Sequence, residues 1–510
     1  MKHLLIITIV SLLIVPVAAL AQAKRQISEK EFTSDLDAYI RRTMGAIPEL
    51  ASVAMVVVKN DKPIFMRAYG LANKETNTKA DVNTLYYIAS STKSYMALAA
   101  AILDREGNIK LNDPLTKYAP GVVFKSPIPE KVKVRDLLTH TSSLRNSPMV
   151  WRMAYSGEIE DKDMLKVLAE GTTYTDDNYG KYAYTNLGYN IYGMLVKLST
   201  GKKWQDVLQE KVFGPLGLKQ TTAYVSKARA AKLPVAESYL FSPDTGTVVR
   251  SPIDKMDNNM QSAGGMFTSL SDLARWLRVN MNNGRLDGKQ VIPADVMQSV
   301  HAGYTDTVRD APPFTGNGKY GLGWQIGKYH EESVIYHHGG FSGWSSHISY
   351  MPDKRIGVAV MINESTAGGR VGHLLATYAY DKWLGTADVD QTYAKELQDS
   401  VEQYGKMKQA QIASVRGRAS RTSQLTRPLK DYTGRYSNEL LGNIDIVVEQ
   451  NTLGARMGYL HVISTPFTEK ESIRVEMTPG QGEVIKFNIT HGGHVDSLTY
   501  AGMKFSRVVK

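Results

Sequence analysis

Ser90 and Lys93 stand three residues apart, directly before the apolar run Tyr95–Leu103. Residues at this spacing are neighbours on one face of a helix, and a helix without a polar face must be buried. Because burial makes an ammonium group costly, this lysine must either be paired or have a lowered pKa. A neutral lysine beside a serine hydroxyl is a general base beside a nucleophile, so the pair predicts nucleophilic catalysis.

Tyr184 and Asn186 form a second candidate group, about a hundred residues further on. Separated by one residue in an extended loop, their side chains would project to the same side. A phenol and a carboxamide would then face a common ligand. The pattern Tyr-x-Asn is also common in turns, so its meaning depends on the other motifs.

His140 offers a competing catalytic arrangement, with Asp136 one helical turn before it as the third member of a Ser-His-Asp triad. We favour a structural role for His140 at a helix end, because Ser90 already has Lys93 as a local base. A Ser-His hydrolase of the α/β type would need the pattern Gly-x-Ser-x-Gly. The nearest approach to it is Gly340-Phe341-Ser342-Gly343, which does not match.

His337 and His338 raise the question of a metal. They are adjacent rather than four residues apart, and no His-Glu-x-x-His run accompanies them. The chain contains no cysteine, which removes thiolate ligands, thiol catalysis and disulfides. The sequence therefore predicts neither a metal site nor a cofactor.

Helices and strands alternate around these residues. A helix is expected over 31–44, a hairpin of strands 51–59 and 63–69 turning at Asn60-Asp61, and a buried helix that begins at the serine and ends at Gly107. Further along we expect helices over 187–198 and after a cap at Ser269 or Ser271, a polar surface excursion over 227–257, and strands near 320–326, 333–336 and 356–362.

The texture changes near Val389. The segment that begins here has apolar residues at helical spacing: Ala394, Leu397, Val401 and Tyr404. It is followed by the basic, serine-rich stretch 416–427. The expected organisation is a domain over 30–385, a helical linker over 388–427 and a small all-β domain over 428–510. That last domain could be a lid, an interaction module or a buttress.

The N-terminus combines Lys2, an apolar run over 4–20 and Ala21-Gln22-Ala23, the pattern of a secretory signal peptide spanning 1–23. An uncleaved anchor is the alternative, although the run is near the lower limit for a membrane span. We expect a periplasmic or secreted protein with no membrane span after cleavage. The net charge of +11 favours an anionic cell-wall polymer as a partner. Nucleic acid is not expected, because no basic run is interleaved with aromatic residues.

The order and spacing of the motifs resemble the penicillin-binding-protein and β-lactamase superfamily of serine hydrolases. The similarity is greatest to the branch of class C β-lactamases, D-alanyl-D-alanine carboxypeptidases, D-aminopeptidases and family VIII esterases. It covers about residues 30–385 and rests on these stretches: Ser90-x-x-Lys93, Leu137–Ser142, Tyr184-x-Asn186, Ala263–Gly265, Tyr320–Trp324 and His337-x-Gly339 with Gly340 and Gly343.

This resemblance implies an α+β fold of the β-lactamase/transpeptidase type, with an antiparallel sheet flanked by helices, an all-helical subdomain and a small C-terminal β-domain. It implies that Ser90 is acylated and that the N–H groups of Ser90 and Gly340 hold the oxyanion. Lys93 or Tyr184 would take the serine proton, and both remain open as the base. Asn186, His337 and Gly339 would line the substrate site.

His337 departs from the lysine that many relatives have at its position. A neutral histidine puts obligatory recognition of a substrate carboxylate in doubt. The expected function is an exported serine hydrolase for β-lactams, D-amino-acid peptides or small esters, with a small molecule or peptide as its partner. The alternative is a penicillin-binding or cell-wall-binding protein of low turnover with the same pocket.

Overall fold

A nine-stranded antiparallel sheet organises the molecule in the computed structural model, which describes residues 27–157, 161–307 and 313–508. The predicted signal peptide lies outside the described residues. The strands, in spatial order, are β12 (Thr305–Asp306), β13 (Thr315–Tyr320), β14 (Gln325–Tyr329), β15 (Glu332–Phe341), β16 (Trp344–Met351), β17 (Ile356–Ile362), β1 (Ser52–Lys59), β2 (Lys62–Asn73) and β3 (Thr78–Lys79).

The neighbouring central strands β1 and β17 are largely apolar because both faces of the sheet are covered. β1 and β17 pair from Val53 opposite Ile362 to Lys59 opposite Ile356, and nearly all their residues are buried. β1 turns into β2 through Asn60, whose φ of 55° suits a tight turn. The hairpin predicted at Asn60-Asp61 is confirmed, and its second strand is longer than expected.

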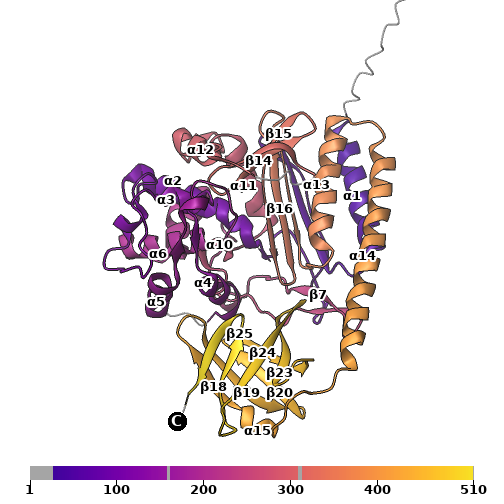
Figure 1. The fold of residues 1–510 in the computed structure, drawn as a ribbon. Helices are drawn as coiled ribbons and strands as arrows, with labels where there is room; N and C mark the ends of the chain where they lie inside the picture. Colours follow the sequence, from indigo (N-terminus) through magenta and orange to yellow (C-terminus); the bar gives the residue numbers. More distant parts are fainter. Residues whose placement is uncertain (1–26, 158–160, 308–312, 509–510) are drawn as a thin grey trace, which may run out of the picture.

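Three helices cover one face of the sheet: α1 (Glu29–Ala46), α13 (Gly368–Leu384) and α14 (Val389–Ala419). Figure 1 shows them side by side on the right of the sheet. Phe32, Leu36 and Ile40 of α1 have the predicted helical spacing and are fully buried. Together with one side of β1, β17 and α13 they form a continuous apolar core.

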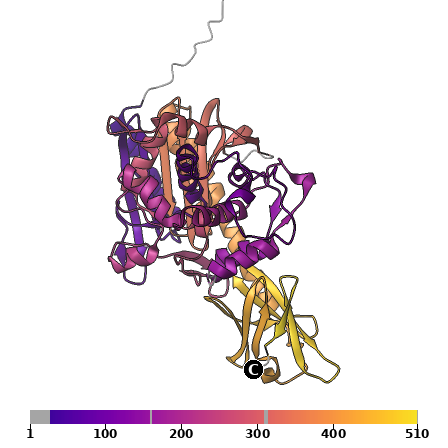
Figure 2. The same ribbon diagram turned by 90° about the vertical axis from the view of Figure 1, so that its left-hand side faces the viewer.

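The opposite face carries a larger helical layer. Helix α11 (Leu270–Met281) packs directly on β1 and β17, and Figure 2 shows the layer in front of the sheet. Ser269 caps α11 through its Oγ, which accepts a hydrogen bond from the N–H of Asp272 at 3.3 Å, as one predicted alternative had it. The helices are α2 (Thr92–Glu106), α3 (Val134–Leu138), α4 (Ser147–Trp151), α5 (Asp161–Gly171), α6 (Leu187–Thr200), α7 (Trp204–Leu208), α8 (Gly214–Leu216), α9 (Val225–Ala230), α10 (Gln261–Gly264), α11 (Leu270–Met281) and α12 (Ala294–His301).

Short strand pairs tie the loops of this layer together. β4 (Tyr86–Tyr87) pairs with β9 (Phe267–Thr268) just before Ser90. The other pairs are β5 (Leu144–Arg145) with β6 (Thr173–Tyr174), β7 (Tyr239–Ser242) with β8 (Thr247–Arg250), and β10 (Arg285–Leu286) with β11 (Lys289–Gln290).

The surface excursion expected over 227–257 is wrong in part. Tyr239, Leu240 and Phe241 of β7 are buried, and the N–H of Tyr239 donates to the carbonyl of Asn363 at the end of β17. The segment therefore packs against the end of the sheet. Its polar residues and proline obscured the short apolar strand within it.

A second nine-stranded antiparallel sheet follows α14, which runs down the side of the molecule toward it (Figure 1). α14 continues to Ala419, so the basic stretch that starts at Arg416 is helical at first. The sheet has its own apolar core. Helix α15 (Leu429–Tyr432) precedes its strands: β18 (Gly434–Asn438), β19 (Gly442–Glu449), β20 (Thr452–Met457), β21 (Leu460–Ile463), β22 (Thr465–Pro466), β23 (Ser472–Thr478), β24 (Gln481–Ile489), β25 (Val495–Tyr500) and β26 (Met503–Arg507).

The second sheet contacts the helical layer around α4. The rings of Trp151 and Tyr500 lie 6.2 Å apart, and Arg152 donates to the carbonyl of Leu440 at 3.2 Å. The α+β class predicted from the sequence, with a separate C-terminal all-β part, is confirmed; the exact domain boundaries stay a prediction. Among the described residues, no helix combines the length and apolar character needed to cross a membrane.

Candidate active site

Ser90 lies in a single 3-10 turn, Ala89–Ser91, between β4 and α2. The sequence predicted a helix beginning at this serine, and the structure instead begins α2 two residues later, at Thr92. Ala89 has a φ of 45°, a left-handed conformation that costs an L-residue about 1–2 kcal/mol. The neighbouring Ile88 is fixed by its N–H, which donates to the carbonyl of Met266.

Lys93 is completely buried in the first turn of α2, where its Nζ contacts three oxygen atoms. Nζ lies 2.7 Å from the carbonyl of Ala263, 2.8 Å from Oδ1 of Asn186 and 3.0 Å from Oγ of Ser90. The carbonyl and the amide oxygen only accept hydrogen bonds. A neutral amine that donates to both of them keeps its lone pair for the Ser90 hydroxyl.

The surroundings of Lys93 favour that neutral form. Burial lowers its pKa well below the usual value of a lysine, because the charged ammonium loses its hydration. Its three close oxygen partners are uncharged. Lys93 is therefore a candidate base held in contact with a candidate nucleophile.

Asn186 and Tyr184 come from the segment just before α6. Asn186 occupies the N-cap position of α6, which places its amide against Lys93. The ring centroid of Tyr184 lies 5.0 Å from Nζ of Lys93. Desolvation raises the pKa of Tyr184 to about 12, against the opposing effect of its hydrogen bond with Ser90. The phenol is therefore protonated at neutral pH.

His337 lies on β15 facing this group, and its ring is buried and uncharged. Nδ1 donates to the carbonyl of His338 at 2.7 Å, which leaves Nε2 to accept from the hydroxyl of Tyr320 at 3.3 Å. Burial, and secondarily the charge that Lys93 can carry, lower the pKa of His337 to about 3. A cationic group does not stand at this position at neutral pH.

Gly339 and Gly340 have different surroundings on the same strand. A Cβ on Gly339 would lie 2.0 Å from the carbonyl oxygen of Ile88, so only glycine lets β15 approach the turn of Ser90 this closely. A Cβ on Gly340 would meet nothing within 4 Å. Gly340 therefore lies beside open space.

That open space is a cavity of about 670 Å³ beside Ser90. Lys93 and Asn186 lie behind it, hydrogen-bonded as described above. The structure thus brings all the predicted site residues together. The cavity lining includes Ser90, Tyr182, Tyr184, His337, Gly339, Gly340 and Phe341.

Comparison with known proteins places the chain in a family. A family model described as "Beta-lactamase" matches residues 36–379, which is more than half of the chain. The chain belongs to the Beta-lactamase family. The family resemblance inferred from the motifs is confirmed, and members of this family are serine hydrolases and penicillin-binding-protein-like proteins.

Curated relatives are identical to this chain at about a quarter of the aligned residues. A D-alanyl-D-alanine-carboxypeptidase/endopeptidase, AmpH, of Escherichia coli K12 is 27% identical over 367 residues, covering 67% of this chain and 87% of the relative. The unguisins hydrolase ungD' of Aspergillus campestris is 23% identical over 392 residues, covering 75% of this chain and 72% of the relative.

Solved structures agree on the fold. The octameric penicillin-binding protein homologue from Pyrococcus abyssi superposes with a TM-score of 0.59 at 21% identity, covering 92% of this chain and 99% of that one. SurE superposes with a TM-score of 0.55 at 18% identity, covering 94% and 100%. The β-lactamase/transpeptidase-like fold expected from the sequence is confirmed.

The competing triad does not form. Nδ1 of His140 accepts from the N–H of Thr185 at 3.3 Å, whereas a triad histidine would donate from this atom to the carboxylate. Oδ2 of Asp136 instead accepts from the N–H of Lys133 at 2.9 Å and the hydroxyl of Tyr179 at 3.0 Å. The ring of His140 packs 4.5 Å from that of Tyr184, so it supports the loop of Tyr184.

Sequence reasoning missed the backbone and second-layer groups of the site. The carbonyl of Ala263 was hidden within the Ala263–Gly265 stretch, which was recognised as a motif without a role. Gly323, in the Tyr320–Trp324 stretch, would place a Cβ 2.4 Å from the carbonyl oxygen of Lys93. The glycines of both stretches were the available signal, because they mark places where backbones approach closely.

Proposed function

We propose that this protein is an exported serine hydrolase that forms an acyl-enzyme on Ser90. The observation that carries the proposal is the position of Lys93, buried, without a charged partner among its close contacts, and 3.0 Å from the serine hydroxyl. Two acceptors orient its amine so that the lone pair is left for the serine proton. This is the arrangement of a general base with its nucleophile.

Acylation then follows from the geometry. Oγ of Ser90 attacks the substrate carbonyl carbon while its proton moves to Nζ of Lys93. The N–H groups of Ser90 and Gly340 would hold the resulting oxyanion. When the bond from the carbonyl carbon to the leaving nitrogen or oxygen breaks, that atom takes a proton, leaving an ester on Ser90 that water hydrolyses.

Lys93 serves as the base, and Tyr184 passes the proton to the leaving group. The raised pKa of Tyr184 supports this division of work, because a phenol that stays protonated is a donor at neutral pH. Asn186 holds the amine of Lys93 in place through its Oδ1. The reverse assignment, with tyrosinate as base, would need the phenol to ionise far below its pKa of about 12.

The uncharged His337 favours substrates in which the group near β15 is a neutral amide or ester. The name of one relative, a D-alanyl-D-alanine-carboxypeptidase/endopeptidase, supports peptides as the main class. β-Lactams and small esters remain within the same chemistry. A substrate carboxylate would have to find its cation elsewhere than at His337.

A second cavity gives room for a larger substrate. It has a volume of about 700 Å³, shares Tyr182 and Tyr184 with the first cavity, and reaches the second sheet. Trp151, Tyr500 and Met503 make part of its lining apolar. We propose that the second sheet completes a subsite for the remainder of a peptide chain.

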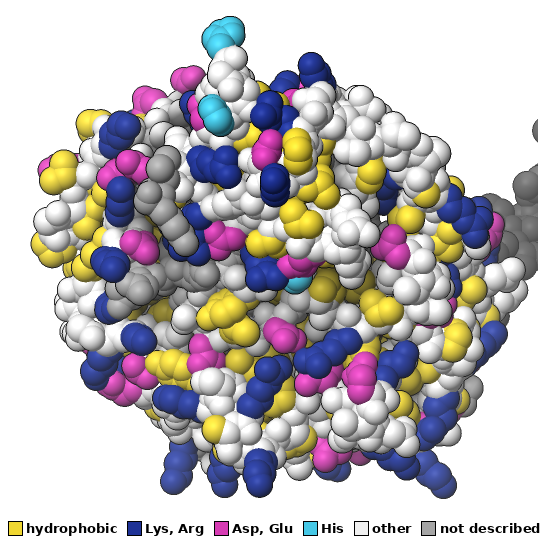
Figure 3. Space-filling view, turned by 90° about the horizontal axis from the view of Figure 1, so that it is seen from below, with side chains coloured by type: hydrophobic (Ala, Val, Ile, Leu, Met, Phe, Trp, Pro, Cys, Tyr) yellow, Lys and Arg dark blue, Asp and Glu magenta, His cyan; other side chains and the backbone are white. Residues whose placement is uncertain are grey.

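Export and the surroundings of the protein complete the proposal. The pattern over 1–23 supports a cleaved signal peptide and a periplasmic or secreted location. Figure 3 shows Lys and Arg side chains spread among Asp and Glu over the face seen from below. The overall positive charge supports attraction to an anionic cell-wall polymer.

The test is labelling and turnover on one preparation. Wild-type protein and Ser90→Ala are incubated with a fluorescent penicillin and a fluorescent phosphonate, and the adduct is located by mass spectrometry. Label on Ser90, lost in Ser90→Ala, is expected; label retained in the variant would disprove the nucleophile. Steady turnover of D-alanyl-D-alanine peptides, nitrocefin or p-nitrophenyl esters is expected after the burst, whereas a stoichiometric burst alone would favour the low-turnover binder.

A further inference from the structure

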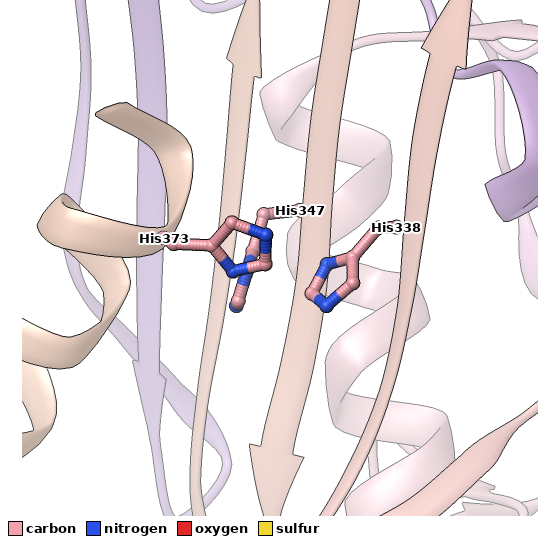
Figure 4. Close-up of side chains that lie close together, drawn as sticks. All are labelled: His338, His347 and His373. Carbon is pink, nitrogen blue, oxygen red and sulfur yellow. The ribbon is translucent and has the colours of Figure 1, made fainter. Parts of the chain in front are cut away.

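Three histidines gather on the face of the sheet opposite Ser90. His338 of β15 and His347 of β16 are direct cross-strand neighbours, and His373 reaches them from α13. Figure 4 shows the three rings converging between the helix and the two strands. Their ring centroids are 4.8 Å apart for His338 and His347, 4.2 Å for His338 and His373, and 5.2 Å for His347 and His373.

Each of the three rings has an unsatisfied nitrogen. Nδ1 of His338, of His347 and of His373 is buried and has no hydrogen-bond partner in the described part of the chain. A buried polar atom left without a partner costs about 1–3 kcal/mol. Three such atoms in one cluster therefore destabilise the folded protein when nothing binds them.

Burial favours the neutral form of the three imidazoles. Burial lowers the pKa of all three below that of a free histidine, and to about 4 for His373. A neutral imidazole offers a lone pair on one nitrogen, which is the form that ligates a metal.

We infer that His338, His347 and His373 form a binding site for a late divalent transition-metal ion, of the class of Zn²⁺. One ligand atom of each residue lies within 4.8 Å of those of the other two. Three nitrogens about 2.0–2.1 Å from a tetrahedral Zn²⁺ would lie about 3.3 Å apart, so rotation of the rings must bring the ligand atoms closer by up to about 1.5 Å. Imidazole suits Zn²⁺, Cu²⁺ and Ni²⁺, whereas Mg²⁺ and Ca²⁺ prefer oxygen.

A group outside the ligand set already orients one ring. Nε2 of His347 lies 2.7 Å from Oγ of Ser349, which in turn lies 2.8 Å from the hydroxyl of Tyr380. A proton on Nε2 that donates to Ser349 leaves the lone pair of His347 on Nδ1, the ring nitrogen without a partner among the described residues. Such outer hydrogen bonds fix the tautomer of ligating histidines.

The cavity beside Ser90 extends to residues that neighbour the cluster. His338 and Gly369 both line the cavity that also contains Ser90, and Gly369 lies one helical turn before His373 on α13. An ion held by the three histidines would have three protein ligands, which leaves one position of a tetrahedral site for water or an anion. It would also link α13 to β15, the strand that carries Gly340.

The test uses protein without a histidine tag, stripped of metal and titrated with Zn²⁺ by calorimetry and with Co²⁺ by visible absorption. We expect one ion per chain, a rise in melting temperature and the d–d bands of tetrahedral Co²⁺. His373→Ala should weaken Zn²⁺ binding at least about 100-fold, and Ser349→Ala about 10- to 100-fold, since removing an outer partner alone has that effect.

His494→Ala is the matched control, because His494 is exposed in the loop between β24 and β25, in the C-terminal β part. It should bind Zn²⁺ as the wild type does. Absence of stoichiometric binding to the wild type, binding unchanged in His373→Ala, or equal loss in His494→Ala would each overturn the site. A normal melting temperature of metal-free His373→Ala shows that the variant is folded. Labelling of Ser90 by the phosphonate is scored separately, so failure of the metal site leaves the hydrolase proposal unaffected.

Discussion

Two adjacent histidines on β15 face opposite sides of the same sheet. His337 points toward Ser90, and both of its ring nitrogens have partners, the carbonyl of His338 and the hydroxyl of Tyr320. His338 points toward α13, and its Nδ1 has no partner among the described residues. On one face of the sheet, therefore, both ring nitrogens of a histidine are hydrogen-bonded. On the other face, a histidine keeps one ring nitrogen without a partner.

This contrast teaches that burial alone does not define a functional histidine. Both rings are buried and uncharged at neutral pH, because desolvation lowers both pKa values. What separates them is whether the lone pair is already used. On the Ser90 face the unused lone pair belongs to Lys93, and on the α13 face it belongs to the histidine cluster.

The largest effect expected on the Ser90 face comes from Lys93→Met. Methionine fills similar space but removes the lone pair beside Ser90. The rate of acylation should fall about 10²- to 10⁴-fold, the usual contribution of a general base. Pre-steady-state labelling with a chromogenic ester measures it.

Lys255→Met is the control for that experiment, since Lys255 is also buried and burial lowers its pKa to about 7. It lies outside the contacts of Ser90, so acylation should keep its rate. The pH dependence of kcat/KM is a second measurement. As the pH falls below the lowered pKa of Lys93, kcat/KM of the wild type should drop tenfold per pH unit. Equal losses in the two lysine variants would contradict the role of Lys93.

The glycine pair on β15 tests how closely the strand must approach the nucleophile. Gly339→Ala would force a Cβ against the backbone of Ile88, and should lower the free energy of unfolding by about 1–3 kcal/mol, as overpacking does. Gly340→Ala meets open space and should change it by less than about 0.5 kcal/mol. Urea unfolding of the two variants makes the comparison; similar losses would mean that the contact is not tight.

Replacing His337 by lysine would give the Ser90 face a cation of the kind that many relatives are expected to have. Substrates with a free carboxylate should then gain about tenfold in kcat/KM relative to matched amides, about 1.4 kcal/mol of preference. The measurement is a ratio between two peptides on each enzyme. An unchanged ratio of kcat/KM between the two peptides would mean that residue 337 does not recognise the substrate carboxylate.

His301 extends the comparison to a buried histidine outside both groups. Its Nε2 lies 2.7 Å from the hydroxyl of Tyr350 and 3.1 Å from Oδ1 of Asn280, and burial lowers its pKa to about 4. Because the unfolded chain binds this proton more readily, stability is lost as the pH falls from about 6.5 toward 4. Between pH 7 and pH 5.5, His301 lowers the free energy of unfolding by about 1 kcal/mol.

In His301→Gln, the free energy of unfolding should therefore decrease less between pH 7 and pH 5.5, by about that amount. Thermal or urea unfolding at several pH values measures it. A pH profile identical to that of the wild type would show that His301 does not take up the proton on unfolding.

The sequence was sufficient for the parts of the site that follow from local patterns. Ser90 with Lys93, and the hairpin at Asn60, depend on spacing and turn chemistry within a few residues. The Ser90 turn itself was mispredicted as the start of a helix, because the constraint on it comes from Met266 and β15, far away in the chain. The strand β7 was missed because only its contact with the end of β17 explains it.

The histidine cluster shows the same limit more strongly. His338 and His347 are nine residues apart on two strands, and their register decides that they face each other. His373 comes from a helix whose packing on the sheet no local pattern specifies. The sequence drew attention to His337 and His338 as a neighbouring pair, whereas the structure separates these two and joins one of them to distant partners.

The packing of α4 against the second sheet has a practical consequence for shortened versions of the chain. Trp151, Tyr155 and Phe341 all pack against the core of that sheet, and Tyr155 stacks on Phe341 at 5.8 Å. A chain cut after Arg427 would present these aromatic side chains to water beside the substrate cavity. Such a fragment would self-associate through them, and the wall of its cavity would lose the support behind Phe341.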